Sequence, residues 1–398
     1  MPWRESSPMS ERFEFIKACF DRKNKTIAEI CFDFGISEKT GHKFIKRFME
    51  SGEKGLKDRS HAVLHHPFRI TEEVQSRILE LKKAHPDYGP QIIHDRLVQH
   101  EPDVHWPAAS SIGEFLKRQG LVRRRPRRNR DHERVHLNSH LTEPTEPNLV
   151  WTADFKGQFR VYSRFGVYCY PLTVMDLNSR FVLGIRALET TSVDQTKCEF
   201  VRIFREYGLP RVIRTDNGVP FAQANALGRL GHLAFWWVRL GIKPEHIRPG
   251  KPQENGAHER FHKTLKAATA KPPSVSLRSQ QKRFDEFITE YNSHRPHRSL
   301  ARRRPPREFY SPSTRPYPNR LPELSYDEGT LVRLVGSNGC IKWQQRPIMI
   351  STNITNQYVG ITEAEGDRFR VSYGDLQLGW IVAETGDFKP EVRWEEPN

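Results

Sequence analysis

The sequence predicts a multidomain protein with α and α/β parts, and three observations support this fold class. Helical periodicity runs through about the first 120 of its 398 residues. From residue 148 short apolar strands alternate with helices, which is typical of an α/β domain. After residue 321 short runs alternate apolar and polar residues, which predicts a small β-barrel-like C-terminal domain over 321–398.

The charge of the chain indicates a polyanionic partner. Lys and Arg number 64 against 48 Asp and Glu, a formal net charge of +16. Residues 321–398 hold seven Lys or Arg against twelve Asp or Glu, so the positive excess lies before residue 321. Because basic proteins gain binding free energy by releasing counterions from phosphates, we expect nucleic acid to bind this earlier part.

The cysteines and the hydrophobic pattern exclude several other classes. Five cysteines stand far apart without a C-x-x-C pair, which argues against a disulfide framework and a cysteine-based zinc site. No apolar run is long enough for a membrane span, and no apolar segment follows the first residues as a secretory signal requires. We therefore expect an intracellular, cytoplasmic protein without membrane contact.

Residues 1–60 are predicted to form a helix-turn-helix DNA-binding domain. Ile27, Ile30, Cys31 and Phe34 share one helical face, Gly35 suits a turn, and Ser37 suits an N-cap. The next helix buries Phe44, Ile45 and Phe48, which leaves a basic side for the major groove. The predicted DNA contacts on that side are Lys39, Thr40, His42, Lys43, Lys46 and Arg47. A three-helix bundle with an ordinary solvated face is the alternative interpretation.

A second helical, helix-turn-helix-like domain is predicted over 68–122, followed by a basic linker over 123–147. The pairs of histidines in this region lack cysteine partners, so solvated or DNA-facing histidines are favoured over zinc ligands. Between Leu121 and Arg134 the chain has seven arginines and two acidic residues, a pattern typical of segments that lie along phosphates. The predicted contacts are Arg123, Arg124, Arg125, Arg127, Arg128 and Arg130.

Two aspartates in the region 148–310 stand at the ends of apolar strands. Asp154 follows Leu149–Ala153, and Asp216 follows Val212–Thr215. Strand ends are rigidly held positions, as metal chemistry needs, although either residue alone would be read as a turn or capping aspartate. Glu259 adds a third carboxylate, on one helical stripe with Lys263 and Lys266. In the functional interpretation, that stripe provides one metal ligand and two phosphate contacts. In the alternative interpretation, the glutamate and a lysine merely form an ion pair within the helix.

At these residues the chain resembles the bacterial insertion-sequence DDE transposases, which have a retroviral-integrase-type core. The resemblance lies in four motifs: Trp151-Thr152-Ala153-Asp154, Thr215-Asp216-Asn217-Gly218, Gly250–Gly256 leading to Glu259-Arg260-Phe261-His262, and Tyr291-Asn292 with Arg295–Leu300. It is dense from about 148 to 306 and weakest after 320. It implies an RNase H-like core with a mixed five-stranded sheet and surrounding helices.

The resemblance also implies the site. Asp154, Asp216 and Glu259 would be the catalytic carboxylates and would bind two Mg²⁺ ions, with Mn²⁺ as a possible substitute. Oxygen ligands suit these hard cations. Gln253 and Asn255, in the third motif, are predicted DNA contacts together with Lys263 and Lys266.

Glu254 competes with Glu259 for the third position. The stretch from Asp216 to Glu259 is longer than is usual for this core, so spacing alone favours Glu254. Glu254 stands in a turn-rich stretch between Pro252 and Asn255, however, whereas Glu259 lies inside the following helix. The family motif also falls on Glu259, which we therefore predict.

The leading functional hypothesis is a DNA transposase that binds the ends of its mobile element. It would catalyse Mg²⁺-dependent cleavage and strand transfer, that is, DNA integration, by a two-metal DDE mechanism. Its partners would be double-stranded DNA, as terminal inverted repeats and target, and at least one further copy of the chain, in the bacterial cytoplasm at the nucleoid. A nuclease of the same fold without strand transfer, and a helix-turn-helix DNA-binding regulator, are the alternatives.

Overall fold

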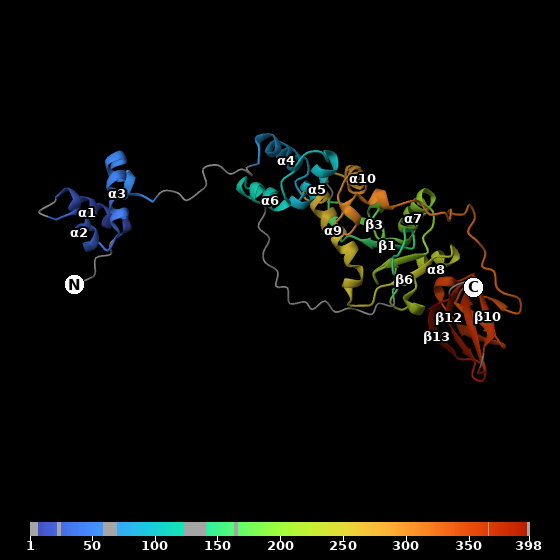
Figure 1. Cartoon of the computed structure of the whole chain (residues 1–398). Helices are drawn as coiled ribbons and strands as arrows, with labels where there is room; N and C mark the ends of the chain where they lie inside the picture. The colour runs from blue at the N-terminus through green and yellow to red at the C-terminus, as the bar shows by residue number, and fades with distance from the viewer. Residues whose placement is uncertain are drawn as a thin grey trace. The chain divides into compact units, whose positions relative to one another are not determined.

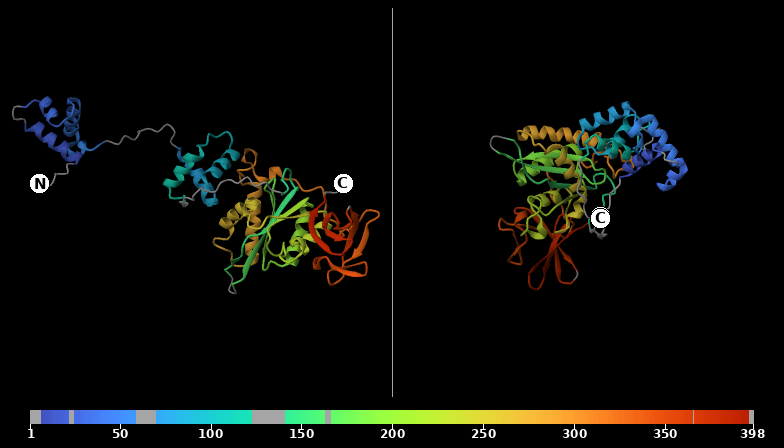
Figure 2. Two further views of the ribbon diagram at one scale, coloured as in Figure 1. Left: turned by 90° about the horizontal axis from the view of Figure 1, so that it is seen from below. Right: turned by 90° about the vertical axis from the view of Figure 1, so that its left-hand side faces the viewer.

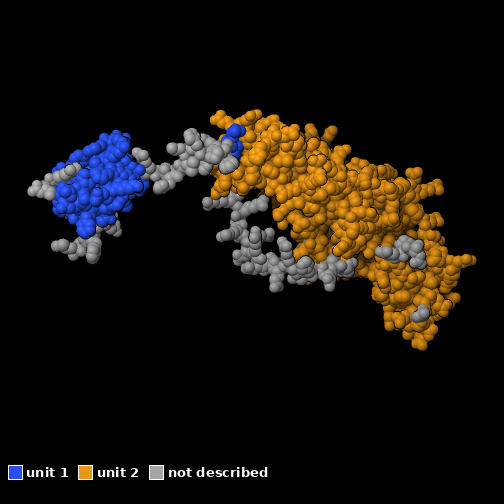
Figure 3. Space-filling model, in the orientation of Figure 1, with its two compact units in different colours: residues 1–71 blue, residues 72–398 orange. Residues whose placement is uncertain are grey.

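In the computed structural model the protein forms two compact units, residues 1–71 and 72–398 (Figure 3). The structure describes residues 7–21, 25–58, 70–122, 141–162, 166–364 and 366–395. The predicted linker contacts Arg123, Arg124, Arg125, Arg127, Arg128 and Arg130 lie outside the described residues.

The first unit contains the predicted helix-turn-helix arrangement, which is confirmed. Its helices are α1 (Pro8–Phe20), α2 (Ile27–Asp33) and α3 (Glu38–Ser51), followed by the short helix η1 (Gly52–Leu56). The turn between α2 and α3 uses Gly35 at φ 64°, a conformation that glycine adopts without strain. The Ser37 side chain then accepts a hydrogen bond from the Thr40 amide and caps α3. Phe15, Cys31 and Phe44 are buried between the helices.

The second unit begins with three helices, and the turn between the first two of them contacts residues 290–295. They are α4 (Glu72–Ala84), α5 (Pro90–His100) and α6 (Ala109–Arg118). An ion pair of 2.8 Å joins Asp87 to Arg295, whose guanidinium also lies 5.0 Å from the centre of the Tyr88 ring. Tyr88 donates a hydrogen bond to Glu290. These contacts make the helical region part of the same unit as the central sheet.

The central sheet is mixed, as predicted. Its strands are β1 (Val150–Phe155), β2 (Phe159–Arg160), β3 (Tyr168–Asp176), β4 (Val182–Leu188), β5 (Val212–Thr215) and β6 (Lys243–His246). β1 pairs antiparallel with β3 and parallel with β5, β5 pairs parallel with β6, and β4 pairs with the other edge of β3. The sheet has six strands rather than five, because β2 resumes the pairing with β3 after a break at 156–158.

Two pairs of helices cover the two faces of this sheet (Figure 1). They are α7 (Val193–Tyr207) with α8 (His232–Arg239), and α9 (Gly256–Thr269) with α10 (Leu277–Ser293). Alternate residues along a strand point to opposite faces. Trp151 accordingly joins the apolar cluster that contains α7 and α8, whereas its neighbour Val150 joins the cluster of α9 and α10.

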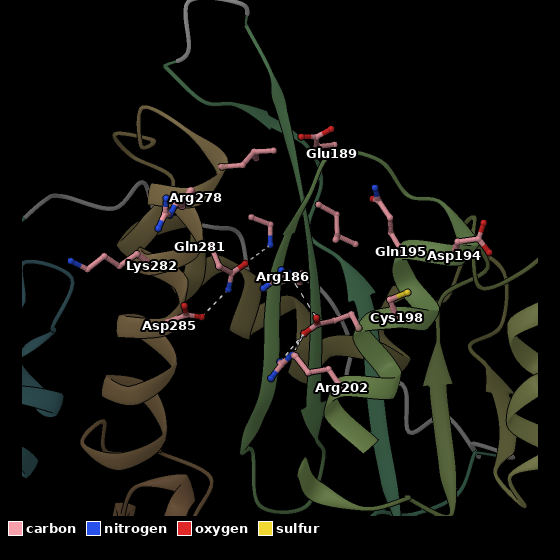
Figure 4. A pocket seen from close by; sticks show the side chains of 14 residues that line it. Arg186, Glu189, Asp194, Gln195, Cys198, Arg202, Arg278, Gln281, Lys282 and Asp285 are labelled. Atoms are coloured by element: carbon pink, nitrogen blue, oxygen red, sulfur yellow. Dashed lines mark hydrogen bonds and ion pairs between the residues drawn. The ribbon is translucent and has the colours of Figure 1, made fainter. Parts of the chain in front are cut away.

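Two amide side chains of α10 occupy the free edge of strand β4, and Figure 4 shows one of them, Gln281. Gln281 accepts a hydrogen bond from the Ala187 amide at 2.8 Å and donates one to the Ile185 carbonyl at 2.9 Å. Asn292 makes the same two kinds of bond with the backbone of Val182, both at 2.9 Å. The amides therefore take the place of a neighbouring strand at an edge that would otherwise expose backbone groups.

The C-terminal region is rich in β-strands, as predicted. A five-stranded antiparallel sheet has the order β13-β12-β11-β10-β7, beside the hairpin β8-β9. The strands are β7 (Leu331–Leu334), β8 (Cys340–Trp343), β9 (Arg346–Met349), β10 (Tyr358–Ala364), β11 (Arg368–Tyr373), β12 (Leu376–Val382) and β13 (Phe388–Trp394). Their core continues into the cluster around α8, on whose side of the central sheet they lie (Figure 2), and Phe235 packs edge-on against Tyr373.

The remaining elements are short. They are the helices η2 (Leu227–Arg229), η3 (Pro252–Asn255), η4 (Ala301–Arg303), η5 (Pro306–Phe309) and η6 (Thr352–Ile354). No helix in the described part of the chain is long and apolar enough to cross a membrane.

Removing the Asn292 side chain tests the role of the amides at the β4 edge. Asn292 is 4% exposed, so Asn292→Ala leaves a buried amide and a buried carbonyl of Val182 without their partner. We expect the free energy of unfolding to fall by about 2 kcal/mol or more, because an unpaired buried polar group is costly. Thr289→Ala, at an exposed position of α10, is the control and should change stability by less than about 0.5 kcal/mol. Equal stability of the two variants in denaturant unfolding would contradict this role.

Candidate active site

The parallel pairing of β1 with β5 brings Asp154 and Asp216 to one edge of the sheet. In the register of the two strands Ala153 stands opposite Thr215, so the residue that follows each of them is an aspartate at the same level. Asp154 lies near the end of β1, and its side chain is 18% exposed. Asp216 directly follows β5, and its carboxylate accepts a hydrogen bond of 3.0 Å from the Gly218 amide. The two strand-end acids predicted from the sequence are therefore neighbours.

Helix α9 contributes Glu259 to the same place. Glu259 lies in the first turn of α9 and is exposed, while Phe261 and Leu265 bury the opposite side of the helix against the sheet. Lys263 and Lys266 are exposed on the Glu259 side. Neither lysine forms an ion pair with a described residue within 4.0 Å, so both ammonium groups are available to phosphates.

The negative charges of these three residues act on one another. Burial, followed by the charge of Asp216 and more weakly that of Glu259, raises the pKa of Asp154 to about 7. In the part of the chain that the structure describes, no lysine or arginine forms an ion pair with these carboxylates, which lie together at a half-open site. Such a group favours a cation, and its oxygen donors fit Mg²⁺ or Mn²⁺ better than softer metals. We call Asp154, Asp216 and Glu259 the carboxylate triad.

Glu254 points elsewhere. Its carboxylate accepts hydrogen bonds from the amide of Arg248 at 2.8 Å and from its Nε at 2.6 Å, and the side chain is 3% exposed. The residue therefore fastens the loop before α9 and is occupied by a cation of the protein itself. This geometry favours Glu259 as the third carboxylate.

Two histidines of α9 lie beside Asp154, and the sequence analysis did not select them. One ligand atom each from Asp154, His258 and His262 lie within 4.8 Å of one another, and His262 Nδ1 is 3.8 Å from the Asp154 carboxylate. Burial lowers the pKa of His258 well below its usual value. Burial and the charge of Lys156 lower the pKa of His262 to about 3, so both rings are neutral at pH 7. The spacing of the two histidines, one turn apart on the helix of Glu259, was the available signal.

The predicted DNA contacts of the first unit lie mostly on the surface of α3. Lys39, His42, Lys43 and Lys46 are exposed, whereas Thr40 and Arg47 are half-buried. The hydroxyl of Thr40 lies 2.9 Å from that of Ser37, and the Arg47 guanidinium lies 5.8 Å from the centre of the Phe44 ring.

Of the two further predicted contacts near α9, Gln253 is exposed and Asn255 is not. Asn255 is 5% exposed, and its Oδ1 accepts a hydrogen bond of 3.1 Å from the Thr152 hydroxyl. The Asn255 side chain therefore fastens the start of α9 to β1 through its Oδ1, and its contact with DNA stays a prediction.

A cavity of about 970 Å³ lies over the end of β4, between α7 and α10 (Figure 4). Residues of both charges line it, among them Arg186, Glu199, Arg202 and Asp285, and none of the carboxylate triad does. Arg202, labelled in Figure 4, forms an ion pair of 2.7 Å with Glu199. The acidic site thus lies at the carboxyl ends of β1 and β5, outside this cavity.

The raised pKa of Asp154 predicts how metal-free stability depends on pH. The folded protein keeps a proton on Asp154 up to about pH 7, whereas the unfolded chain releases it near 3.8. Stability is therefore greatest below pH 4 for this group and is lost as pH rises to about 7, by on the order of a few kcal/mol. In EDTA, Asp154→Asn should raise the melting temperature more at pH 8 than at pH 5. Asp387→Asn, at an exposed site, is the control; a pH-independent effect of Asp154→Asn would contradict the assignment.

Comparisons with known proteins agree with this geometry. Two family profiles described as integrase core domain match residues 144–252 and 240–305, and a profile described as homeodomain-like domain matches residues 40–116. The insertion element IS476 uncharacterized 39.2 kDa protein of Xanthomonas euvesicatoria is 27% identical over 251 residues, which cover 61% of this chain and 66% of that protein. The Gag-Pol polyprotein of baboon endogenous virus is 29% identical over 132 residues, 33% of this chain and 7% of that protein. The chain thus spans just under two thirds of the first relative and a small part of the second.

Solved structures with similarity include the HTLV-2 integrase catalytic core domain in complex with magnesium (trimeric form). It is 16% identical, with a TM-score of 0.33, covering 42% of this chain and 99% of that chain. The simian T-cell lymphotropic virus intasome in complex with the PP2A regulatory subunit B56 gamma is 14% identical, with a TM-score of 0.36, covering 81% and 99%. The two family profiles and the insertion-element relative agree with one another: residues 144–305 match integrase core domains, and the matches support an insertion-sequence transposase with an integrase-type core.

Proposed function

We propose that this protein is a DNA transposase that binds the ends of a mobile element and performs Mg²⁺-dependent cleavage and strand transfer. The observation that carries the proposal is the carboxylate triad, brought together from β1, β5 and α9 within an integrase core domain. A structural group of carboxylates would be expected to carry cationic partners, as Glu254 does with Arg248. A catalytic group must leave its oxygens free.

Asp154, Asp216 and Glu259 would hold the metal, with two ions in each site. Bound Mg²⁺, or Mn²⁺ in its place, would activate the attacking oxygen and stabilise the leaving oxygen. The exposed Lys263 and Lys266 would hold phosphates of the DNA on the same side of α9. Gln253, exposed just before α9, is a further proposed contact.

The proposed chemistry consists of two in-line displacements at phosphorus. In cleavage the oxygen of water bonds to phosphorus, the bond to the 3′-oxygen breaks, and that oxygen leaves with the electron pair and takes up a proton. In strand transfer the freed 3′-hydroxyl loses its proton and attacks a phosphorus of target DNA, whose own 3′-oxygen leaves. The number of phosphodiester bonds is conserved in the second step. Neither step requires a covalent bond between protein and DNA.

The other parts of the chain would hold the DNA. The exposed basic side chains of α3 would read the element ends, and the arginines Arg123–Arg130 would follow the phosphate backbone. Two ends must be joined to one target, so at least two copies of the chain would act together on DNA. The bacterial cytoplasm, at the nucleoid, would be the place of action.

Substitution of the two glutamates tests the proposed function. Glu259→Gln should abolish both cleavage and strand transfer on duplexes carrying the element ends, because the third carboxylate is lost, while end binding persists. Glu254→Gln is the matched control: it should lower stability by about 1–3 kcal/mol through the weakened bond to Arg248, yet keep most activity. Activity assays in Mg²⁺ that gave the reverse order would refute the assignment. If the unmodified protein cleaved the DNA but did not perform strand transfer, a simple nuclease would be favoured.

A single lysine of α3 tests the proposed end recognition. Lys43→Ala in the full chain should weaken binding of end DNA and reduce the slope of log affinity against log salt by roughly 0.9 for each lost phosphate contact. Lys389→Ala, in the acidic C-terminal region, should leave both quantities unchanged. Binding isotherms at several salt concentrations measure the difference, and an equal effect of the two variants would argue against α3 as the contact.

A further inference from the structure

A buried polar cluster joins the start of α9 to strands β1 and β3 next to Asp154. Its members are the hydroxyls of Thr152 and Thr173, the rings of His258 and His262, and the amide of Asn255. Thr152, Thr173 and His258 are fully buried. We call this group the threonine–histidine cluster.

Thr173 of β3 is the centre of the cluster. Its hydroxyl donates to the backbone carbonyl of Asp154 at 2.9 Å, and lies 2.6 Å from His258 Nε2 and 2.8 Å from His262 Nε2. The Thr173 hydroxyl therefore lies within hydrogen-bonding distance of three neighbours. One side chain therefore contacts both the backbone of a triad residue and two turns of the helix that carries another.

Thr152 of β1 makes the second connection. Its hydroxyl lies 3.2 Å from His258 Nδ1 and bonds to Asn255 Oδ1 at 3.1 Å. The residues of α9 and its N-cap that are held in this way, Asn255, His258 and His262, lie on both sides of Glu259 in the chain. Glu259 itself is exposed, so the position of its carboxylate depends on how the backbone of α9 is held.

We infer that the threonine–histidine cluster positions Glu259 relative to Asp154, and that Thr173 and His258 are its principal positioning residues. The inference rests on the proposed function of the carboxylate triad. Apolar contacts such as those of Phe261 and Leu265 hold α9 against the sheet. Hydrogen bonds are directional, so those of the cluster further restrict the rotation of α9 and its place along the axis. The cluster acts through α9.

The test compares two buried threonines in the full-length protein. Thr173→Val removes the central hydroxyl with little change of shape. Thr269→Val is the matched control, because Thr269 is also buried but its hydroxyl bonds only to the Leu265 carbonyl of its own helix. Calorimetric titration with Mn²⁺ alone measures metal affinity, and cleavage of end DNA gives kcat and KM.

We expect Thr173→Val to lose about 10-fold or more in Mn²⁺ affinity and in kcat, as residues that orient metal ligands do, with KM for DNA within about twofold. Thr173→Ser, which keeps the hydroxyl, should restore both. Thr269→Val should resemble the unmodified protein. Equal metal affinity and kcat in Thr173→Val and Thr269→Val would overturn the inference.

A third measurement separates this inference from the proposed function. If the unmodified protein neither binds Mn²⁺ nor cleaves DNA, the proposed function fails, but amide hydrogen exchange of residues 256–262 still reports how α9 is held. Thr173→Val must then speed exchange there and not in α10, and unchanged exchange overturns the inference. If Thr173→Val does not fold, His262→Leu replaces it in all three measurements, because His262 lies at the 12%-exposed margin of the cluster.

Discussion

The parallel pairing of β1 with β5 is the constraint on which the site depends. Four residue pairs, from Val150 opposite Val212 to Ala153 opposite Thr215, fix the two strands in one register. Because the strands run in the same direction, their carboxyl ends meet, and the acids that follow them meet as well. A shift of one residue would turn Asp154 to the other face of the sheet and separate it from Asp216. The site then requires only that α9, which carries Glu259, packs next to the carboxyl ends of β1 and β5.

The surrounding scaffold holds three carboxylates close together although their negative charges repel one another. Asp154 is mostly buried beside two other carboxylates, which raises its pKa and disfavours the metal-free folded state. The position of β1 offsets this repulsion, because β1 is a central strand that is paired with β3 on one side and β5 on the other. Its residues Trp151 and Val150 are buried on opposite faces of the sheet. The amide side chains of α10 complete the sheet at its β4 edge. A stable scaffold thus maintains an arrangement that is favoured by a bound cation, or by a proton on Asp154.

The sequence predicted the parts of the site that follow from local patterns. Asp154 and Asp216 were found because each ends an apolar strand, and Glu259 was preferred to Glu254 because it lies inside a helix. The bonds of Asn255 and His258 to Thr152 were not predictable, since they join residues far apart in the chain whose contact depends on the packing of α9 on the sheet. The structural role of Asn255 at the start of α9 was missed for this reason. The contact of Asp87 with Arg295, which attaches the second helical region to the catalytic sheet, is of the same long-range kind.

Anomalous diffraction from crystals of the full-length protein grown with Mn²⁺ tests the central claim most directly. The account predicts manganese peaks between the carboxylates of Asp154, Asp216 and Glu259, with Glu254 still bonded to Arg248. Manganese bound elsewhere, with the carboxylate triad paired to lysine or arginine side chains of the protein, would contradict it.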